Sequence, residues 1–306
     1  MIRRRLLLTA GAIALMGSGC NILGPRPAKH DDIPPPLPSV DDRKPTAEQL
    51  ISYLNRQADQ LESIETRSLD IDVKSMGSSV SLDGSLVCQK PRNFKLVGRK
   101  LAMEQVLMGS NSDRFWFYIR QDPSNALFHC SYTDFEKGVD LPYPFDPEWV
   151  LEALGMAKIN AGPGTTVEED RNHYKLIEET TVRGQKVKKV TVFHKGNARD
   201  SQPQIVSKTM MDAATNKVIC TAIIKEVARI PIERGAGLPP KYIICPRIIT
   251  LEWPQQDTKL TLDLGKLRVN QPIKPDLFEM PPDVGAKQVD LGKFKPTGRV
   301  VPAGYR

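Results

Sequence analysis

Histidines and cysteines are the side chains here best suited to acid–base, nucleophilic or metal chemistry, and their spacing favours none of these. No two histidines stand at the spacing of metal ligands. His129 and Cys130 are neighbours on a predicted strand, where adjacent side chains point to opposite faces, so they form no dyad with each other. The sequence therefore predicts no catalytic residue, no metal site and no cofactor. The histidines are His30, His129, His173 and His194.

The first twenty residues predict another kind of chemistry, the attachment of lipid to a cysteine. Three arginines, a short apolar run and three small residues occupy positions 3–19 in that order, which is how a bacterial secretory signal is built. Cys20 follows directly and resembles the lipobox cysteine of bacterial lipoproteins, whose thiol receives a diacylglycerol; Gly17 stands where leucine is usual. We predict a signal peptide over residues 1–19 and lipidation of Cys20. A plainly cleaved secretory signal is the alternative.

The other four cysteines leave two interpretations open. They are Cys88, Cys130, Cys220 and Cys245. An even number in an exported chain permits two disulfides, and four cysteines allow three pairings. Buried free thiols on strands are the alternative.

The charge balance limits the partners. The chain has 43 Lys and Arg against 36 Asp and Glu, a formal net charge of +7, of which three arginines leave with the predicted signal. A small dispersed excess fits contact with anionic lipid headgroups and does not form a nucleic-acid-binding stripe. No second apolar run is long enough to span a membrane, so we expect attachment through lipid.

Composition divides the mature chain into three parts. Residues 20–44 are rich in proline and polar residues, which predicts an extended tether behind the lipidated Cys20. Residues 45–282 hold the periodic apolar patterns of one folded domain. Residues 283–306 are rich in Gly, Pro and Lys, which predicts a loose tail.

Periodicity predicts a mainly β domain with short helices. A helix begins after Thr46, which stands at capping-box spacing from Gln49, and its apolar period continues to Ile64. A second, capped helix is expected over residues 146–155. The remaining patterns alternate with a period of two and give about ten or eleven antiparallel strands. They form either a closed barrel or a half-open one, a curved sheet whose concave face the helices cover; the amphipathic first helix favours the half-open form.

Five short segments resemble the LolA and LolB lipoprotein carriers and receptors. They are residues 69–73, residues 91–96, residues 113–118 with the turn before them, residues 211–218 and residues 276–282. The resemblance implies an unclosed barrel with helices as a lid around a hydrophobic cavity that takes lipid acyl chains. It favours the membrane-anchored receptor type, because this chain has the lipoprotein leader.

The apolar positions of the strands are the candidates for lining such a cavity, and a dry packed core is the alternative. The candidates are Leu69, Ile71, Val73, Phe94, Leu96, Phe115, Phe117, Leu260, Leu262 and Leu264. Residues 141–145 form an apolar, Pro-rich segment. Its residues Leu141, Tyr143 and Phe145 are candidates for a loop that contacts the membrane, and an ordinary connection is the alternative.

The resemblance and the leader together imply an envelope protein whose partners are a lipid acyl chain, the membrane through its lipid anchor and an envelope protein. Asn21, not aspartate, follows Cys20, which favours the outer membrane facing the periplasm over the inner membrane. A non-catalytic scaffold or interaction protein with the same fold is the alternative function.

Overall fold

The computed structural model describes residues 44–75, 77–139, 141, 146–160, 162–195, 204–232 and 241–293. The predicted signal peptide, Cys20 and nearly all of the predicted tether lie outside these residues. Within the described part, no helix is both long and apolar enough to cross a membrane.

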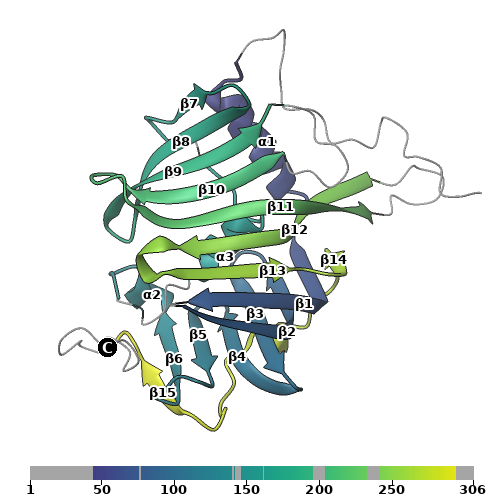
Figure 1. Ribbon diagram of the computed structural model, residues 1–306, viewed down its shortest axis with the longest axis vertical. Helices are drawn as coiled ribbons and strands as arrows, with labels where there is room; N and C mark the ends of the chain where they lie inside the picture. The colour runs from purple at the N-terminus through teal and green to yellow at the C-terminus, as the bar shows by residue number, and fades with distance from the viewer. Residues whose placement is uncertain are drawn as a thin grey trace, which may run out of the picture. The chain divides into compact units, whose positions relative to one another are not determined.

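The described residues form fifteen strands in one sheet (Figure 1). The strands follow the order β15-β6-β5-β4-β3-β2-β1-β13-β12-β11-β10-β9-β8-β7, and β14 pairs with β1 beside β13. All neighbours are antiparallel except β15 and β6, which are parallel. The two ends of this order do not pair with each other, so the predicted mainly β, curved and half-open architecture is confirmed. The strands are β1 (Ser63–Ser75), β2 (Ser78–Gln89), β3 (Asn93–Lys100), β4 (Met103–Ser110), β5 (Arg114–Ile119), β6 (Ala126–Ser131), β7 (Thr166–Glu169), β8 (His173–Val182), β9 (Gln185–His194), β10 (Ile205–Asp212), β11 (Val218–Ile232), β12 (Lys241–Trp253), β13 (Thr258–Asp263), β14 (Leu267–Val269) and β15 (Lys287–Asp290).

Short strands account for most of the excess over the expected ten or eleven. Strands β13 and β14 belong to one stretch of alternating residues that is interrupted at Gly265, whose φ is +41°. A Cβ at Gly265 would lie 2.1 Å from the backbone oxygen of Ser68, so only glycine fits this close approach.

The tail predicted to be loose contains β15, so that prediction is wrong for Lys287–Asp290. Val289 and Leu291 pack against the aromatic cluster of Phe115 and Phe117. This strand has few apolar residues and no apolar face of its own, so its sequence gives little strand signal. It is stabilised by pairing with the edge strand β6.

Helix α1 (Ala47–Ala58) begins at the predicted capping box. The Gln49 amide donates to Thr46 Oγ1 at 3.3 Å, and the Thr46 amide donates to Gln49 Oε1 at 2.8 Å. The helix ends at Ala58, so the expected continuation to Ile64 is wrong; Ile64 is a buried residue of β1. The chain leaves the helical path because the Glu62 amide donates at 2.8 Å to Oδ1 of Asn270, the residue after β14, which pairs with the start of β1.

Two short helices follow β6: α2 (Tyr132–Phe135) and α3 (Pro147–Ala153), and 3-10 turns occupy Pro254–Gln256 and Pro275–Phe278. Helix α3 confirms the capped helix expected over residues 146–155. Asp146 Oδ1 accepts from the Glu148 amide at 2.9 Å, and Gly155 beyond the helix has a φ of +78°.

The largest hydrophobic cluster joins α3 to both halves of the sheet through strands β1 to β3 and β9 to β13. Pairing of β1 with β13 brings Ile71 opposite Leu262, and both residues belong to this cluster. Helix α1 has a separate, smaller cluster in which Leu50 and Leu54 pack with Leu176 of β8 and Phe193 of β9. The two helices therefore cover the sheet through different sets of contacts.

Candidate functional site

A cavity of about 50 Å³ lies between α1, the end of α3 and strands β10 to β12. We call it the first cavity. Most of its lining is apolar. The described residues that line it are Tyr53, Gln57, Leu61, Ala153, Leu154, Gly155, Gln204, Ile205, Lys208, Ile224, Val227, Arg229, Ile244 and Pro246.

Helix α1 covers this cavity with Tyr53 and Gln57. The Tyr53 ring packs edge-on against Phe193, with ring centroids 6.3 Å apart. Burial raises the pKa of Tyr53 to about 12. Asn55 ties the helix to the loop after α3: its Nδ2 donates to the Ile159 oxygen at 2.8 Å, and its Oδ1 accepts from the Ile159 amide at 2.8 Å. At the C-terminal end of the helix, Lys90 Nζ donates to the Ala58 oxygen at 2.5 Å and Lys158 Nζ lies 2.6 Å from Asp59 Oδ1, so apolar contacts, the Asn55 amide and two lysines hold the cover in place.

Two cationic side chains face the first cavity, and none of its described lining residues is acidic. Lys208 is only 4% exposed, and its Nζ donates to the backbone oxygen of Glu152 at 2.9 Å. Arg229 Nε is buried and has no hydrogen-bond acceptor among the described residues. Sequence reasoning missed both residues, since each is an isolated cation on a strand.

A buried group of charges separates this cavity from its neighbour. Lys189 Nζ lies 2.6 Å from Glu152 Oε2. Burial lowers the pKa of Lys208. Burial acts in the same direction on Lys189, but the attraction and the hydrogen bond of Glu152, together with the attraction of Glu178 and Asp146, raise the pKa of Lys189 overall. Glu178 stands opposite Lys189 in the β8–β9 pair, and burial together with Glu152 raises its pKa to about 7.

The second cavity, of about 360 Å³, lies on the other side of this group. Its lining includes Arg92, Asp146, Glu148, Glu152 and Lys189, beside Pro91, Trp149, Leu151, Met156, Ala157, Val182 and Met210. Each of its three carboxylates has a basic partner. Arg92 Nε lies 2.7 Å from Glu148 Oε1, and the Arg183 guanidinium lies 2.7 Å from Asp146 Oδ2.

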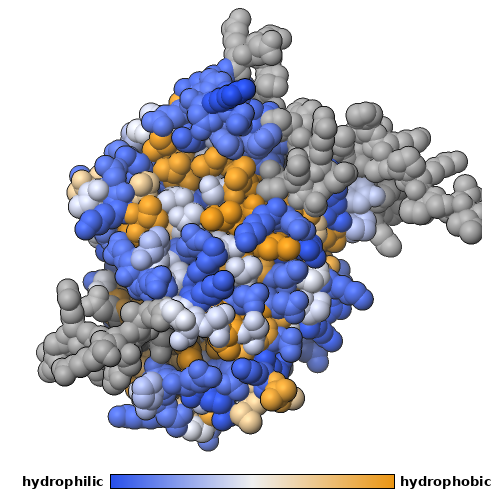
Figure 2. All heavy atoms as spheres, viewed as in Figure 1, coloured by the Kyte–Doolittle hydropathy of each residue, from blue (hydrophilic) through white to orange (hydrophobic). Residues whose placement is uncertain are grey.

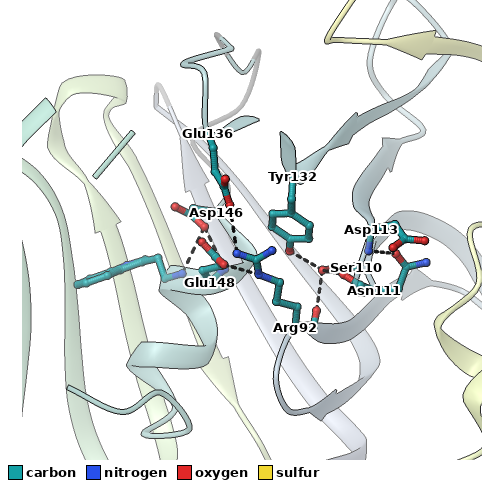
Figure 3. Close-up of polar contacts among 9 residues, drawn as sticks. Arg92, Ser110, Asn111, Asp113, Tyr132, Glu136, Asp146 and Glu148 are labelled. Carbon is teal, nitrogen blue, oxygen red and sulfur yellow. Dashed lines mark hydrogen bonds and ion pairs between the residues drawn. The ribbon is translucent and has the colours of Figure 1, made fainter. Parts of the chain in front are cut away.

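Figure 3 shows how Arg92 connects α2, α3 and the turn between β2 and β3. Its guanidinium reaches both Glu148 and Glu136, at 2.7 and 3.3 Å, and stands over the ring of Tyr132 at 4.2 Å. The hydroxyls of Tyr132 and Ser110 are 2.6 Å apart, and Ser110 Oγ donates to the Arg92 oxygen at 2.6 Å. Every polar group named here is satisfied by another member of the same group, which indicates that Arg92 has a structural role.

The ten predicted cavity residues pack in hydrophobic clusters, and none lines either cavity. Phe115 and Phe117 belong to a cluster with Phe135 of α2. The other eight are buried in the largest cluster or pack against it: Leu69, Ile71, Phe94, Leu96, Leu262 and Leu264 are buried, and Val73 and Leu260 are partly buried. Their contact with lipid stays a prediction.

The four cysteines are buried free thiols, so none of the three disulfide pairings is formed in this structure. The register explains this: Cys88 stands opposite Phe94 and Cys130 opposite Phe115, while Cys220 stands opposite Met210. Cys245 stands opposite Ala228.

Of the predicted membrane-contact loop, Leu141 is partly buried against the aromatic cluster, and Tyr143 and Phe145 lie outside the described residues. The β3–β4 hairpin instead exposes apolar side chains. Leu101 is 94% exposed and Met103 53%. Figure 2 shows hydrophobic atoms at the end of this hairpin, at the lower right, among hydrophilic ones. Sequence reasoning missed it, although the signal was present: two apolar residues fill a two-residue turn where Asn and Gly are usual.

Among the described residues, no group of three or more His, Cys, Asp or Glu side chains is arranged to hold a metal ion. The acidic side chains nearest to each cavity are engaged with lysine or arginine, as described above.

No protein-family model and no curated protein matches the sequence. Among solved structures, a putative outer membrane lipoprotein-sorting protein domain from Vibrio parahaemolyticus is similar, with 14% identity, a TM-score of 0.47 and coverage of 76% of this chain and 97% of that one. A LolA superfamily protein from Nitrosomonas europaea has 10% identity, a TM-score of 0.47 and coverage of 78% and 99%. A DUF1329 family protein from Desulfovibrio piger has 12% identity, a TM-score of 0.42 and coverage of 76% and 95%. The superfamily that the sequence segments resemble is thus represented among them, and likenesses this distant establish no family membership.

Proposed function

We propose that this chain is an envelope lipoprotein that binds an acyl chain of a lipid or lipoprotein between α1 and the concave face of the sheet. The observation that carries the proposal is an apolar cavity, closed by an amphipathic helix that has its own small set of contacts. Residues 20–44 would hold the domain to the membrane through lipid on Cys20, and the outer membrane facing the periplasm is the proposed location.

Binding by burial needs no catalytic group. Each buried methylene of an acyl chain contributes about 0.8 kcal/mol, so a dozen methylenes are enough for strong binding. Sites for molecules of this size measure about 300–1,000 Å³. The first cavity, at about 50 Å³, must therefore widen. Helix α1 is the element to move, because its cluster with Leu176 and Phe193 is separate from the largest core.

The exposed β3–β4 hairpin supports a position next to a membrane. Leu101 projects beyond the strands, and the exposed cations Arg99 and Lys100 precede it. An apolar tip flanked by cations suits insertion among anionic headgroups.

The proposal is tested by purifying the full chain from membranes and recording its native mass spectrum. We expect a mass increment that organic extraction removes and identifies as acyl lipid. Val227→Trp fills the first cavity from a half-buried position and should lower lipid occupancy about tenfold. Val218→Trp lies on the same strand outside the cavity and is the matched control.

Absence of any co-purifying lipid, together with no transfer of a fluorescent acyl probe into the purified protein, would contradict the proposal. A stable protein partner that crosslinks equally well to Val227→Trp would favour the scaffold alternative.

A further inference from the structure

We infer that the ligand of the first cavity is an anionic amphiphile, whose single carboxylate or phosphate group is bound by Lys208 and Arg229. The inference rests on the proposed function, since it names the class of lipid that the same cavity takes. It concerns the head of the ligand, whereas the proposed function concerns its acyl chain.

The hydrogen-bonding groups of the cavity are the first argument. A lysine ammonium has three donors and an arginine guanidinium five, and neither has an acceptor. Lys208 donates one hydrogen bond to the Glu152 oxygen, and Arg229 Nε donates none to any described residue. The other polar side chains of the lining are already engaged: Gln57 with Tyr53, and Gln204 with the His194 oxygen. The cavity thus offers unused donors, which suits a ligand group that only accepts.

The charges of the cavity are the second argument. Buried ionic groups in proteins are normally paired, because an isolated charge is costly to remove from water. The Glu152 carboxylate is paired with Lys189 at 2.6 Å, and Lys208 hydrogen-bonds the backbone oxygen of Glu152, so Lys208 forms no ion pair of its own among the described residues. Arg229 has no ion pair with any described residue. One negative charge in the cavity would attract both cations and neutralise one of the two positive charges.

The second cavity shows that this excess is particular to the first. Its three carboxylates meet Arg92, Arg183 and Lys189 within the protein, and no cation is left over. The same concave face therefore holds the second cavity, whose charges are paired within the protein, and the first cavity, whose two cations have no carboxylate in the described lining. The uncompensated cations coincide with the more apolar lining, which is the combination that an amphiphile with an anionic head requires.

Isothermal titration calorimetry with delipidated full-length protein distinguishes the contribution of the ligand's head group to the affinity from that of its acyl chain. Dodecanoate, 1-dodecanol and dodecyltrimethylammonium share a tail and differ in charge, and acetate and inorganic phosphate lack the tail. We expect dodecanoate to bind at least about tenfold more tightly than 1-dodecanol, as a hydrogen-bonded charge contributes. Dodecyltrimethylammonium should bind more weakly than either.

Equal affinity for dodecanoate and 1-dodecanol would overturn the inference and leave the proposed function standing. Failure of every long-chain probe to bind would overturn both. Acetate or phosphate binding as tightly as dodecanoate would also overturn it, because the site would then bind a free anion and not a lipid head.

Variants assign the effect to the two cations. Arg229→Gln and Lys208→Met should each reduce the preference for dodecanoate over 1-dodecanol about tenfold, mainly through weaker binding of dodecanoate, because the uncharged hydroxyl of 1-dodecanol makes only a neutral hydrogen bond. Lys225→Met removes an exposed cation from the same strand as Arg229 and should change neither affinity. If loss of the Glu152 contact unfolds Lys208→Met, half-buried Arg229→Gln still decides the question. An unchanged preference in folded Arg229→Gln would overturn the role of that residue and the inference with it.

Discussion

The two cavities both have cations in their linings, and they differ in whether carboxylates accompany them. In the second cavity, Arg92 and Lys189 are each within 2.7 Å of a carboxylate, and the walls are held together by these pairs. In the first, Lys208 and Arg229 face an apolar space whose described lining has no carboxylate. The size of a cavity is thus a poor guide to its role here. In the larger cavity the charged groups are paired within the protein, and in the smaller one two cations remain available to bind a ligand.

The elements that border the cavities differ in the same way. Helix α3 contributes Trp149 and Leu151 to the largest core and is capped by Asp146, which also binds Arg183. Helix α1 is attached through a separate apolar cluster, through Asn55 and, at its C-terminal end, through Lys90 and Lys158. A firm wall and a removable cover are what a lipid-binding site needs, because the entry of an acyl chain requires one side to open.

The largest effect should come from breaking the buried pair between the cavities. Glu152→Gln removes the ion-pair partner of Lys189 in a setting where the side chains of Glu152 and Lys189 are 13% and 23% exposed, and should lower the free energy of unfolding by about 3 kcal/mol. Urea denaturation measures this. Glu148→Gln, whose partner Arg92 is more exposed, is the control and should cost about 0.5 kcal/mol. Equal decreases in the free energy of unfolding for both variants would show that the Glu152–Lys189 pair stabilises the fold no more than an exposed ion pair does.

Filling the two cavities in turn tests which one binds lipid. Val227→Trp in the first cavity should reduce acyl-probe binding about tenfold, equivalent to about 1.4 kcal/mol. Val182→Trp in the second should leave binding unchanged. Fluorescence titration with an acyl probe on both variants gives the comparison, and the reverse pattern would assign the ligand to the charged cavity.

The pH dependence of stability should report on Glu178. Its pKa is raised from 4.5 to about 7, so the native state keeps this proton to higher pH than the unfolded chain. The unfolding free energy contributed by Glu178 therefore decreases as pH rises through this window. Glu178→Gln should remove that decrease, whereas Glu179→Gln, at the exposed next position, should retain it. Urea midpoints on both sides of the window decide, and identical pH profiles for wild type and Glu178→Gln would contradict the assignment.

The smallest effect on stability is expected outside both cavities, at the β3–β4 hairpin. Leu101 has a φ of +51°, a conformation that asparagine adopts more readily than leucine. Leu101→Asn should raise the unfolding free energy by about 0.5 kcal/mol and weaken binding to vesicles that contain phosphatidylglycerol. Vesicle sedimentation measures the binding, with Leu101→Met as the apolar control. Undiminished binding by Leu101→Asn would remove the hairpin from the membrane contact.

Local patterns predicted most of the elements correctly. The capping box of α1 and the Asp–Pro start of α3 involve residues a few positions apart, so their chemistry is visible along the chain. The strands that were missed, such as β15, have few apolar residues and form because an edge is already there to pair with. The end of α1 was misplaced for a related reason, since Asn270, more than 200 positions away, redirects the chain at Glu62.

The sequence by itself determined the class of the domain, the two main helices and the faces on which apolar residues lie, because these depend on periodicity and on capping between near neighbours. Only the tertiary structure decided which apolar faces meet each other and which meet a cavity. Leu260 and Leu262 alternate as a cavity wall would, yet pairing with β1 and β12 places Leu262 in the core and packs Leu260 against it. Lys208 and Arg229 are unremarkable strand cations until α1 closes over them, because alternation specifies the face of a side chain and not the element that covers it.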